Sequence, residues 1–268
     1  MTYCNVKTTS QIILFSMFFL LFTIAFNARA DLVDAPDVEV AIVIGGSLQN
    51  GQVAEDHPLA GGWYIGGLYK TWVDHIATLT DKKYHWLNYG NAGAVSSTGS
   101  AQIEKAISQT TWALNGAPPK SHIKTLVLSF WGNVFLWGPF NQAAVDTMIS
   151  DMNDQITTAK ANGIEKIVMM GMPHYKDMDL DRFLQVFPLP GHIDEAGYNE
   201  VRRQYYEAFA AAPNPDFLFV DAWCSYETLD GLHANYKSAS KAAQKVFVAL
   251  GVYDELIGHR NLASCTPQ

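Results

Sequence analysis

The sequence Ile42-Val43-Ile44-Gly45-Gly46-Ser47-Leu48 is an apolar run that ends in two glycines and a serine. Such a run is typical of a buried strand followed by a tight turn, because glycine adopts positive φ without steric cost. Ser47 is then expected just beyond the carboxyl end of a strand, where open α/β sheets collect ligands and catalytic groups. Its hydroxyl is therefore a candidate nucleophile, although Gly-Gly-Ser is also common turn chemistry.

Four further apolar runs have the length of buried strands, and stretches with helical periodicity separate them. This alternation is typical of a parallel sheet with helices on both faces. We therefore expect a three-layer α/β/α domain with a flavodoxin-like, five-stranded parallel sheet. A long loop, 173–193, is expected to act as a lid or binding segment. The expected strands are 38–44, 84–87, 125–130, 164–172 and 217–220, and the expected helices are 63–80, 101–114, 141–161, 195–211 and 234–250.

The first 30 residues have the features of a cleavable signal peptide. Lys7 precedes the apolar-rich segment 12–26, and Ala28-Arg29-Ala30 has the small-x-small pattern of a signal-peptidase site. An uncleaved membrane anchor is the alternative, but the segment has 15 residues, fewer than the roughly 20 that span a bilayer. We expect cleavage after Ala30, which makes 1–30 the signal peptide of a secreted or periplasmic protein and 31–268 a single domain.

The mature chain is acidic. Of the 268 residues, 238 remain after cleavage, with 16 basic and 26 acidic side chains and a net charge of −10. A chain of this charge is not expected to bind nucleic acid, because phosphate backbones attract basic proteins. With 49% hydrophobic residues in the full chain and no internal repeat, the composition fits one domain with a large core.

Two cysteines remain after cleavage, because Cys4 lies in the signal peptide. Export to an oxidising compartment favours a disulfide between Cys224 and Cys265. It would close a loop of 41 residues, for which the chain-entropy model gives about 4 kcal/mol. Two free buried thiols or a metal site are the alternatives, and a metal site lacks further Cys or His residues at suitable spacing.

The turn Asp230-Gly231-Leu232-His233 carries the most specific chemical pattern in the chain. A carboxylate three residues before a histidine can accept the Nδ1 proton of the imidazole, which leaves Nε2 to act as a base. A serine nucleophile needs such a base. The turn therefore complements Ser47, if the fold brings the two together.

These two segments resemble sequence blocks of the SGNH (GDSL) hydrolase family of esterases and lipases. Gly45-Gly46-Ser47-Leu48 is similar to the family's Gly-Asp-Ser-Leu block, and Asp230-Gly231-Leu232-His233 is similar to its Asp-Gly-x-His block. Within the family the chain is most similar to thermolabile haemolysin-like lipases and acyltransferases. The resemblance covers nearly all of 38–250, and only the last block is close to identical.

The resemblance implies that Ser47 is the nucleophile, His233 the base and Asp230 the carboxylate that orients His233. The implied reaction is acyl transfer through an acyl-serine intermediate, without a cofactor. Hydrolysis and transfer to another alcohol both stay open, as do the acyl-chain length and the alcohol of the substrate.

The same resemblance implies an oxyanion hole made of the Ser47 amide, the Gly93 amide and the Asn133 side chain. These donors would face the charge that develops in the tetrahedral intermediate. A shifted alignment replaces Gly93 by Ser96, and either residue can supply a backbone N–H.

Three positions depart from the family pattern: Gly46 replaces an aspartate, Trp131 a glycine and Val134 an acidic residue. Such positions shape the site, and the Trp131 ring would narrow the oxyanion hole. Two hypotheses follow. The first is an exported serine esterase or lipase that acts on a lipid or other carboxylic ester, and a lipid substrate implies transient contact with a membrane surface. The second is a catalytically impaired member of the fold that binds a lipid or a glycan.

Two histidines flank the long loop. His174 and His192 are candidates to line a substrate groove, together with Trp131. The sequence predicts no metal site, because its histidines show no His-x-His or His-x-x-x-His spacing.

Overall fold

The computed structural model describes residues 39–50, 52–53, 64–65, 71–80, 84–113, 123–187 and 189–251. The expected signal peptide, its cleavage site after Ala30 and the expected disulfide partner Cys265 lie outside these ranges. The signal peptide, the export of the chain and the Cys224–Cys265 bond therefore stay predictions.

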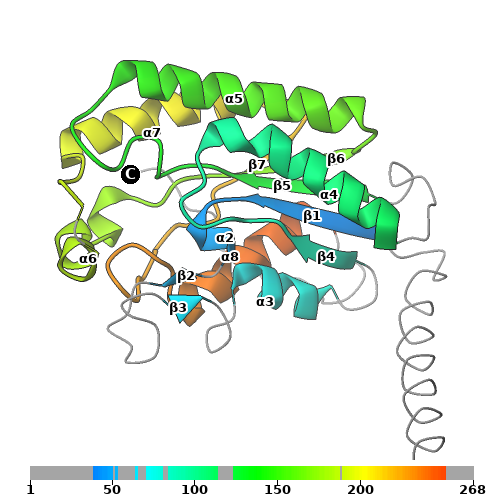
Figure 1. Ribbon diagram of the computed structural model, residues 1–268, viewed down its shortest axis with the longest axis horizontal. Coiled ribbons are helices and arrows are strands. Elements are labelled where there is room, and N and C mark those ends of the chain that lie inside the picture. Colours follow the sequence, from blue (N-terminus) through cyan, green and yellow to red (C-terminus); the bar gives the residue numbers. More distant parts are fainter. Residues whose placement is uncertain are drawn as a thin grey trace, which may run out of the picture. The chain divides into compact units, whose positions relative to one another are not determined.

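A five-stranded sheet forms the centre of the described domain, with the strand order β4-β1-β5-β6-β7 (Figure 1). All neighbouring strands in it run parallel. The second strand of this sheet in chain order lies at one edge, beside the first, which is the flavodoxin-like order, so the expected fold class is confirmed. The sheet consists of β1 (Glu39–Gly45), β4 (Tyr84–Asn88), β5 (Ile123–Ser129), β6 (Lys166–Met170) and β7 (Leu218–Val220), while β2 (Gln52–Val53) and β3 (Tyr64–Ile65) form a separate antiparallel pair.

Strand β1 is buried on both faces. Its side chains alternate, so that Ile42 and Ile44 pack with one layer of helices and Ala41 and Val43 with the other. An unbroken run of apolar residues is what such a strand requires. β1 lies between β4 and β5, where the chain switches from one half of the sheet to the other. Its carboxyl end therefore opens at the position where doubly wound sheets bind ligands.

Helices cover both faces of the sheet and complete the three layers (Figure 1). α4 (Gly99–Ala113), α5 (Gln142–Ala161) and α7 (Glu195–Phe209) cover one face, and α3 (Trp72–Leu79) and α8 (Tyr236–Ala249) cover the other. Each helix turns apolar side chains to the sheet, as Met148 does from α5 and Ala243 from α8. None of the helices in the described ranges is both long and apolar enough to cross a membrane.

Helix α3 begins later than its apolar pattern suggested, at Trp72 instead of residue 63. Thr71 and Asp74 form a capping box there. The Thr71 hydroxyl accepts a hydrogen bond from the backbone N–H of Asp74 at 3.2 Å, and the Asp74 carboxylate accepts one from the backbone N–H of Thr71 at 2.8 Å. This reciprocal pair satisfies two backbone donors of the first turn and fixes where the helix starts.

The segment 173–193 is not a continuous loop, which corrects the expectation from its prolines. It contains the 3₁₀ turn η3 (Tyr175–Asp177) and the helix α6 (Leu180–Val186). The Asp179 side chain caps α6 by accepting a hydrogen bond from the backbone N–H of Arg182 at 3.0 Å. Within the helix, Leu180 and Phe183 lie one turn apart and are both buried. A helix of this length offers too few apolar positions for its period to be recognised in the sequence.

Candidate active site

Ser47 follows β1 through a turn that requires glycine at position 45. Gly45 has φ +149°, and a β-carbon on it would lie 2.3 Å from the carbonyl oxygen of Ser129. The buried side chain of Gln102 makes two hydrogen bonds to the backbone of Gly45. Its Oε1 accepts one from the Gly45 N–H at 2.9 Å, and its Nε2 donates one to the Gly45 carbonyl at 3.3 Å. Ser47 is the first residue of α2 (Ser47–Asn50). The hydroxyl therefore lies at the carboxyl edge of the sheet, as predicted.

Asp230 and His233 lie in a tight turn that packs against the start of α6. Gly231 has φ +98°, and a β-carbon on it would lie 2.1 Å from the carbonyl oxygen of Asp179. The Asp179 amide donates to the Gly231 carbonyl at 2.8 Å, and the Leu229 amide donates to the His233 carbonyl at 2.8 Å. The turn is thus closed on itself and fastened to α6.

The side chains of Ser47, His233 and Asp230 form a continuous hydrogen-bond chain. Ser47 Oγ lies 2.8 Å from His233 Nε2, and His233 Nδ1 lies 2.6 Å from Asp230 Oδ2. Asp230 and His233 are 2% and 3% exposed. The ring of Phe183 packs edge-on with the imidazole, with centroids 5.6 Å apart. The structure therefore brings together the three residues that the resemblance marks as nucleophile, base and orienting carboxylate.

The environment of Asp230 favours its ionised form. Burial would raise the pKa of this carboxyl, but the charge and hydrogen bond of His233, with the Leu232 and His233 amides, lower the pKa below its usual value. Those two amides donate to Asp230 Oδ1 at 2.9 and 2.6 Å. Oδ2 is left to accept the Nδ1 proton of His233, which directs the lone pair of Nε2 toward Ser47 Oγ.

Two of the expected oxyanion donors, Gly93 and Asn133, line a cavity beside Ser47. Asn133 follows β5, and its Nδ2 donates to the Ala94 carbonyl at 3.0 Å, which uses one of the two N–H bonds of the amide. Gly93 lies in the turn after β4, with φ +73°. Ser96, the alternative to Gly93, is not among the described residues that line this cavity, and its hydroxyl donates to a carboxylate of α5 at 2.6 Å. Of these two candidates Gly93 is the one that lines the cavity, and its role as an oxyanion donor stays a prediction.

The cavity that Gly93 and Asn133 border, which we call the larger cavity, has a volume of about 360 Å³. This size is typical of small-molecule sites, which range from roughly 300 to 1,000 Å³. Aromatic rings form much of its wall, since Trp137 and Phe183 stack with centroids 5.3 Å apart and planes at 20°. The lining residues are Ser47, Ala92, Gly93, Asn133, Trp137, Phe183, Phe187, Leu189, Leu232 and His233.

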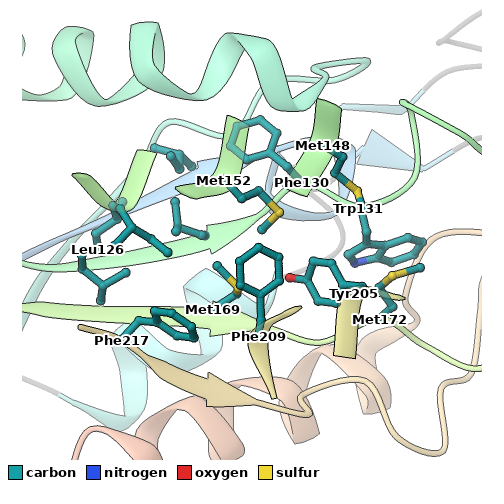
Figure 2. Close-up of a cluster of buried hydrophobic side chains, with 14 of the residues drawn as sticks. Leu126, Phe130, Trp131, Met148, Met152, Met169, Met172, Tyr205, Phe209 and Phe217 are labelled. Carbon is teal, nitrogen blue, oxygen red and sulfur yellow. The ribbon is translucent and has the colours of Figure 1, made fainter. Parts of the chain in front are cut away.

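A second cavity, the smaller cavity, also reaches Ser47 and has a volume of about 20 Å³. Trp131 and Leu136, 6% and 1% exposed, form apolar parts of its wall. Figure 2 shows the Trp131 ring in the same core cluster as Met148 and Met172. A buried indole therefore bounds the space next to Ser47, at the position where the resemblance implies glycine.

Neither His174 nor His192 is among the described residues that line these two cavities. Nδ1 of His192 lies 2.7 Å from the Ile193 carbonyl oxygen, and Nε2 lies 3.0 Å from Asp181 Oδ1. Burial would lower the pKa of His192, but these two acceptors raise it; burial lowers the pKa of His174. A role for either in substrate binding stays a prediction. Within the described ranges, no group of three or more His, Cys, Asp or Glu residues is placed to hold a metal ion.

Sequence reasoning missed residues that support the site. Gln102 holds Gly45, and its only signal is a polar side chain beside Ile103 on an otherwise apolar helix face. Leu189 and Leu232 line the larger cavity. Their positions in turns show no periodicity, so no pattern in the sequence marks them.

Comparison with known proteins identifies the fold. No family model and no curated protein matches the sequence. An inhibitor-bound aryl esterase of M. smegmatis is similar in structure, with a TM-score of 0.54 and 14% identity over 80% of this chain and 98% of that chain. A carbohydrate acetylesterase from Sinorhizobium meliloti has a TM-score of 0.53 and 12% identity over 80% of this chain and 99% of that chain. At such identities the likeness bears on the fold alone, and the fold of this chain is that of the SGNH hydrolases.

Proposed function

We propose that the protein is a carboxylic ester hydrolase that works through an acyl-serine intermediate. The observation that carries this proposal is the hydrogen-bond chain from Ser47 Oγ through His233 to the buried Asp230 carboxylate. Ser47, at one end of this chain, lines the larger cavity, and so does Asn133, whose side-chain amide can donate hydrogen bonds. The nucleophile, its base and a proposed oxyanion donor therefore line the same cavity.

In the first half of the reaction, Ser47 Oγ attacks the ester carbonyl carbon while His233 Nε2 takes the hydroxyl proton. The carbonyl oxygen becomes an oxyanion, and the donors that we propose for it are the amides of Ser47 and Gly93 and the Asn133 side chain. His233 then gives its proton to the departing alcohol oxygen, and the acyl group stays on Ser47.

In the second half, His233 removes a proton from water, and the resulting nucleophile attacks the acyl carbon. Collapse of this second intermediate returns the proton to Ser47 Oγ and releases the carboxylic acid. Asp230 keeps its negative charge throughout and stabilises the imidazolium form of His233 in both halves. An alcohol in place of water would make the enzyme an acyltransferase.

The substrate we propose is an ester with an apolar portion, such as a lipid or aryl ester. The aromatic wall of the larger cavity supports this proposal, because aromatic rings offer an apolar surface to an apolar part of the substrate. Two structural relatives, an aryl esterase and a carbohydrate acetylesterase, support the proposal of ester cleavage. Export is part of the proposal and rests on the sequence alone. The haemolysin-like lipase specificity that the resemblance implies stays a prediction, which the acyl-chain preference of the enzyme tests.

Turnover of p-nitrophenyl acetate, butyrate and palmitate by the purified mature chain tests this function, with Ser47→Ala as the control. We expect turnover of at least one ester by the wild type and none above background by Ser47→Ala. An inert wild type that gains activity when Trp131→Gly is combined with Gly46→Asp would favour the impaired, lipid- or glycan-binding protein. A β-carbon on Gly46 would lie 3.3 Å from Asn133 Nδ2, so the first atom of a side chain at this position requires a shift of a few tenths of an ångström.

A further inference from the structure

Two cavities of very different size meet at Ser47, and His233 lines only the larger of them. We infer that the larger cavity holds the alcohol half of the ester and that the smaller cavity holds the acyl half, which limits the acyl group to about the size of acetyl. This inference rests on the proposed function. It reverses the arrangement of a lipase for long fatty-acyl chains, because the apolar bulk belongs to the leaving alcohol.

The assignment of the alcohol follows from the position of the acid. His233 Nε2 must protonate the departing oxygen, so that oxygen has to lie within hydrogen-bond reach of Nε2. The alcohol attached to it then extends into the space that His233 borders. That space is the larger cavity, where Phe183 and Phe187 continue the wall beyond the imidazole.

Because the alcohol half takes the larger cavity, the acyl group must bind in the smaller one. Its volume of about 20 Å³ is enough for one water-sized group, which is also about the size of the methyl group of acetate. Trp131 and Leu136 close it with side chains that pack in the core. Because packed cores resist displacement, a longer alkyl chain has no room unless these side chains move.

The larger cavity suits a bulky apolar alcohol. About 360 Å³ of space accommodates a naphthyl ring or a medium-length alkyl group, and the stacked rings of Trp137 and Phe183 offer it an aromatic surface. The expected substrate is therefore a short-chain ester of an apolar alcohol or phenol.

Two ratios of kcat/KM measured on the wild type test the assignment. The acyl ratio compares p-nitrophenyl acetate with p-nitrophenyl octanoate, and we expect the acetate to be preferred by at least about 100-fold, which is within the discrimination that a tight pocket achieves. The alcohol ratio compares 2-(2-naphthyl)ethyl acetate with ethyl acetate, whose leaving alcohols are similar in acidity, and the naphthyl ester should be preferred. Equal rates on the acetate and the octanoate would overturn the inference.

Variants in the two walls should then act on different ratios. Trp131→Phe and Leu136→Val, which remove atoms from the smaller cavity's wall, should lower the acyl ratio by about tenfold and leave the alcohol ratio unchanged. Phe187→Ala and Leu189→Ala, in the larger cavity, should lower the alcohol ratio alone. Thermal unfolding of each variant verifies that it is folded, and the two pairs serve as controls for each other.

The inference fails if Phe187→Ala changes the acyl ratio while Leu136→Val does not. The proposed function is tested separately, by the ester turnover of the Ser47→Ala variant. Ester turnover that survives Ser47→Ala contradicts the proposed function whatever the ratios are, and a wild type inert on every ester contradicts both.

Discussion

Gly45 and Ser129 lie on neighbouring strands, and a β-carbon on Gly45 would come within 2.3 Å of the Ser129 carbonyl oxygen. The two residues are paired in the register of β1 and β5. Their close approach places the start of the nucleophile turn directly against the strand that leads to Asn133. The positions of Ser47 and Asn133 relative to each other therefore depend on glycine at position 45.

Gly45→Ala should destabilise the fold strongly. The variant adds an L side chain at φ +149° and a clash with backbone, so we expect a loss of about 3 kcal/mol or more in the free energy of unfolding. Gly138→Ala is the matched control, because Gly138 has φ +129° but open space where its β-carbon would lie. It should lose about 1–2 kcal/mol. Urea denaturation measures both, and equal losses would show that the contact with Ser129 is unimportant.

Asp230→Asn should keep the fold and lose most of the turnover. The side-chain oxygen of the introduced asparagine can still accept hydrogen bonds from the backbone N–H groups of Leu232 and His233. The neutral side chain cannot stabilise the imidazolium form of His233, and its NH₂ group favours the wrong tautomer of the imidazole. We expect kcat to fall by up to about 10⁴-fold. The measurement is kcat on p-nitrophenyl acetate, with circular dichroism to confirm folding. A folded variant with the wild-type rate would make Asp230 a turn residue only.

The lowered pKa of Asp230 predicts a pH-dependent contribution to stability. A carboxyl whose folded-state pKa lies below its unfolded value, about 3.9, stabilises the fold above that value and loses the contribution as pH falls through the folded-state pKa. The difference in unfolding free energy between wild type and Asp230→Asn should therefore be larger at pH 6 than at pH 3. Asp154→Asn, at an exposed position of α5, is the control. A difference for Asp230→Asn that is the same at both pH values would contradict the prediction.

Asn133→Ala should slow the chemical step with little effect on substrate binding. The Asn133 side chain donates most strongly when the oxyanion forms, so kcat should fall by about 10² to 10³-fold while KM stays nearly constant. Steady-state kinetics on one p-nitrophenyl ester measures both constants. If the variant behaves like wild type while Ser47→Ala is inactive, the oxyanion hole is made of other groups.

The sheet and the placement of Ser47 followed from the sequence for a clear physical reason. Buried parallel strands need continuous apolar runs, and the run 42–44, which stops at Gly45, has the composition and the ending of such a strand. The edge at which Ser47 lies is then a consequence of sheet topology. The turn with Asp230 and His233 was recognisable because its chemistry depends on two residues at fixed local spacing.

Other features of the site depend on contacts between distant segments, which local patterns do not encode. Gln102 and Gly45 meet only after α4 packs on β1, and α6 is held by its contact with Gly231. The sizes of the two cavities depend on how the Trp131 and Leu136 side chains settle in the core. These features required the folded structure, although the residues themselves are ordinary in the sequence.

The identity of the nucleophile tests the proposed function most directly. The purified mature chain is treated with a fluorophosphonate probe, which forms a covalent bond with an activated serine, and the modified peptide is identified by mass spectrometry. We expect a single adduct on Ser47 that is absent from Ser47→Ala and greatly reduced in His233→Ala. An adduct on another serine, or labelling that persists in Ser47→Ala together with esterase activity, would contradict the proposed function.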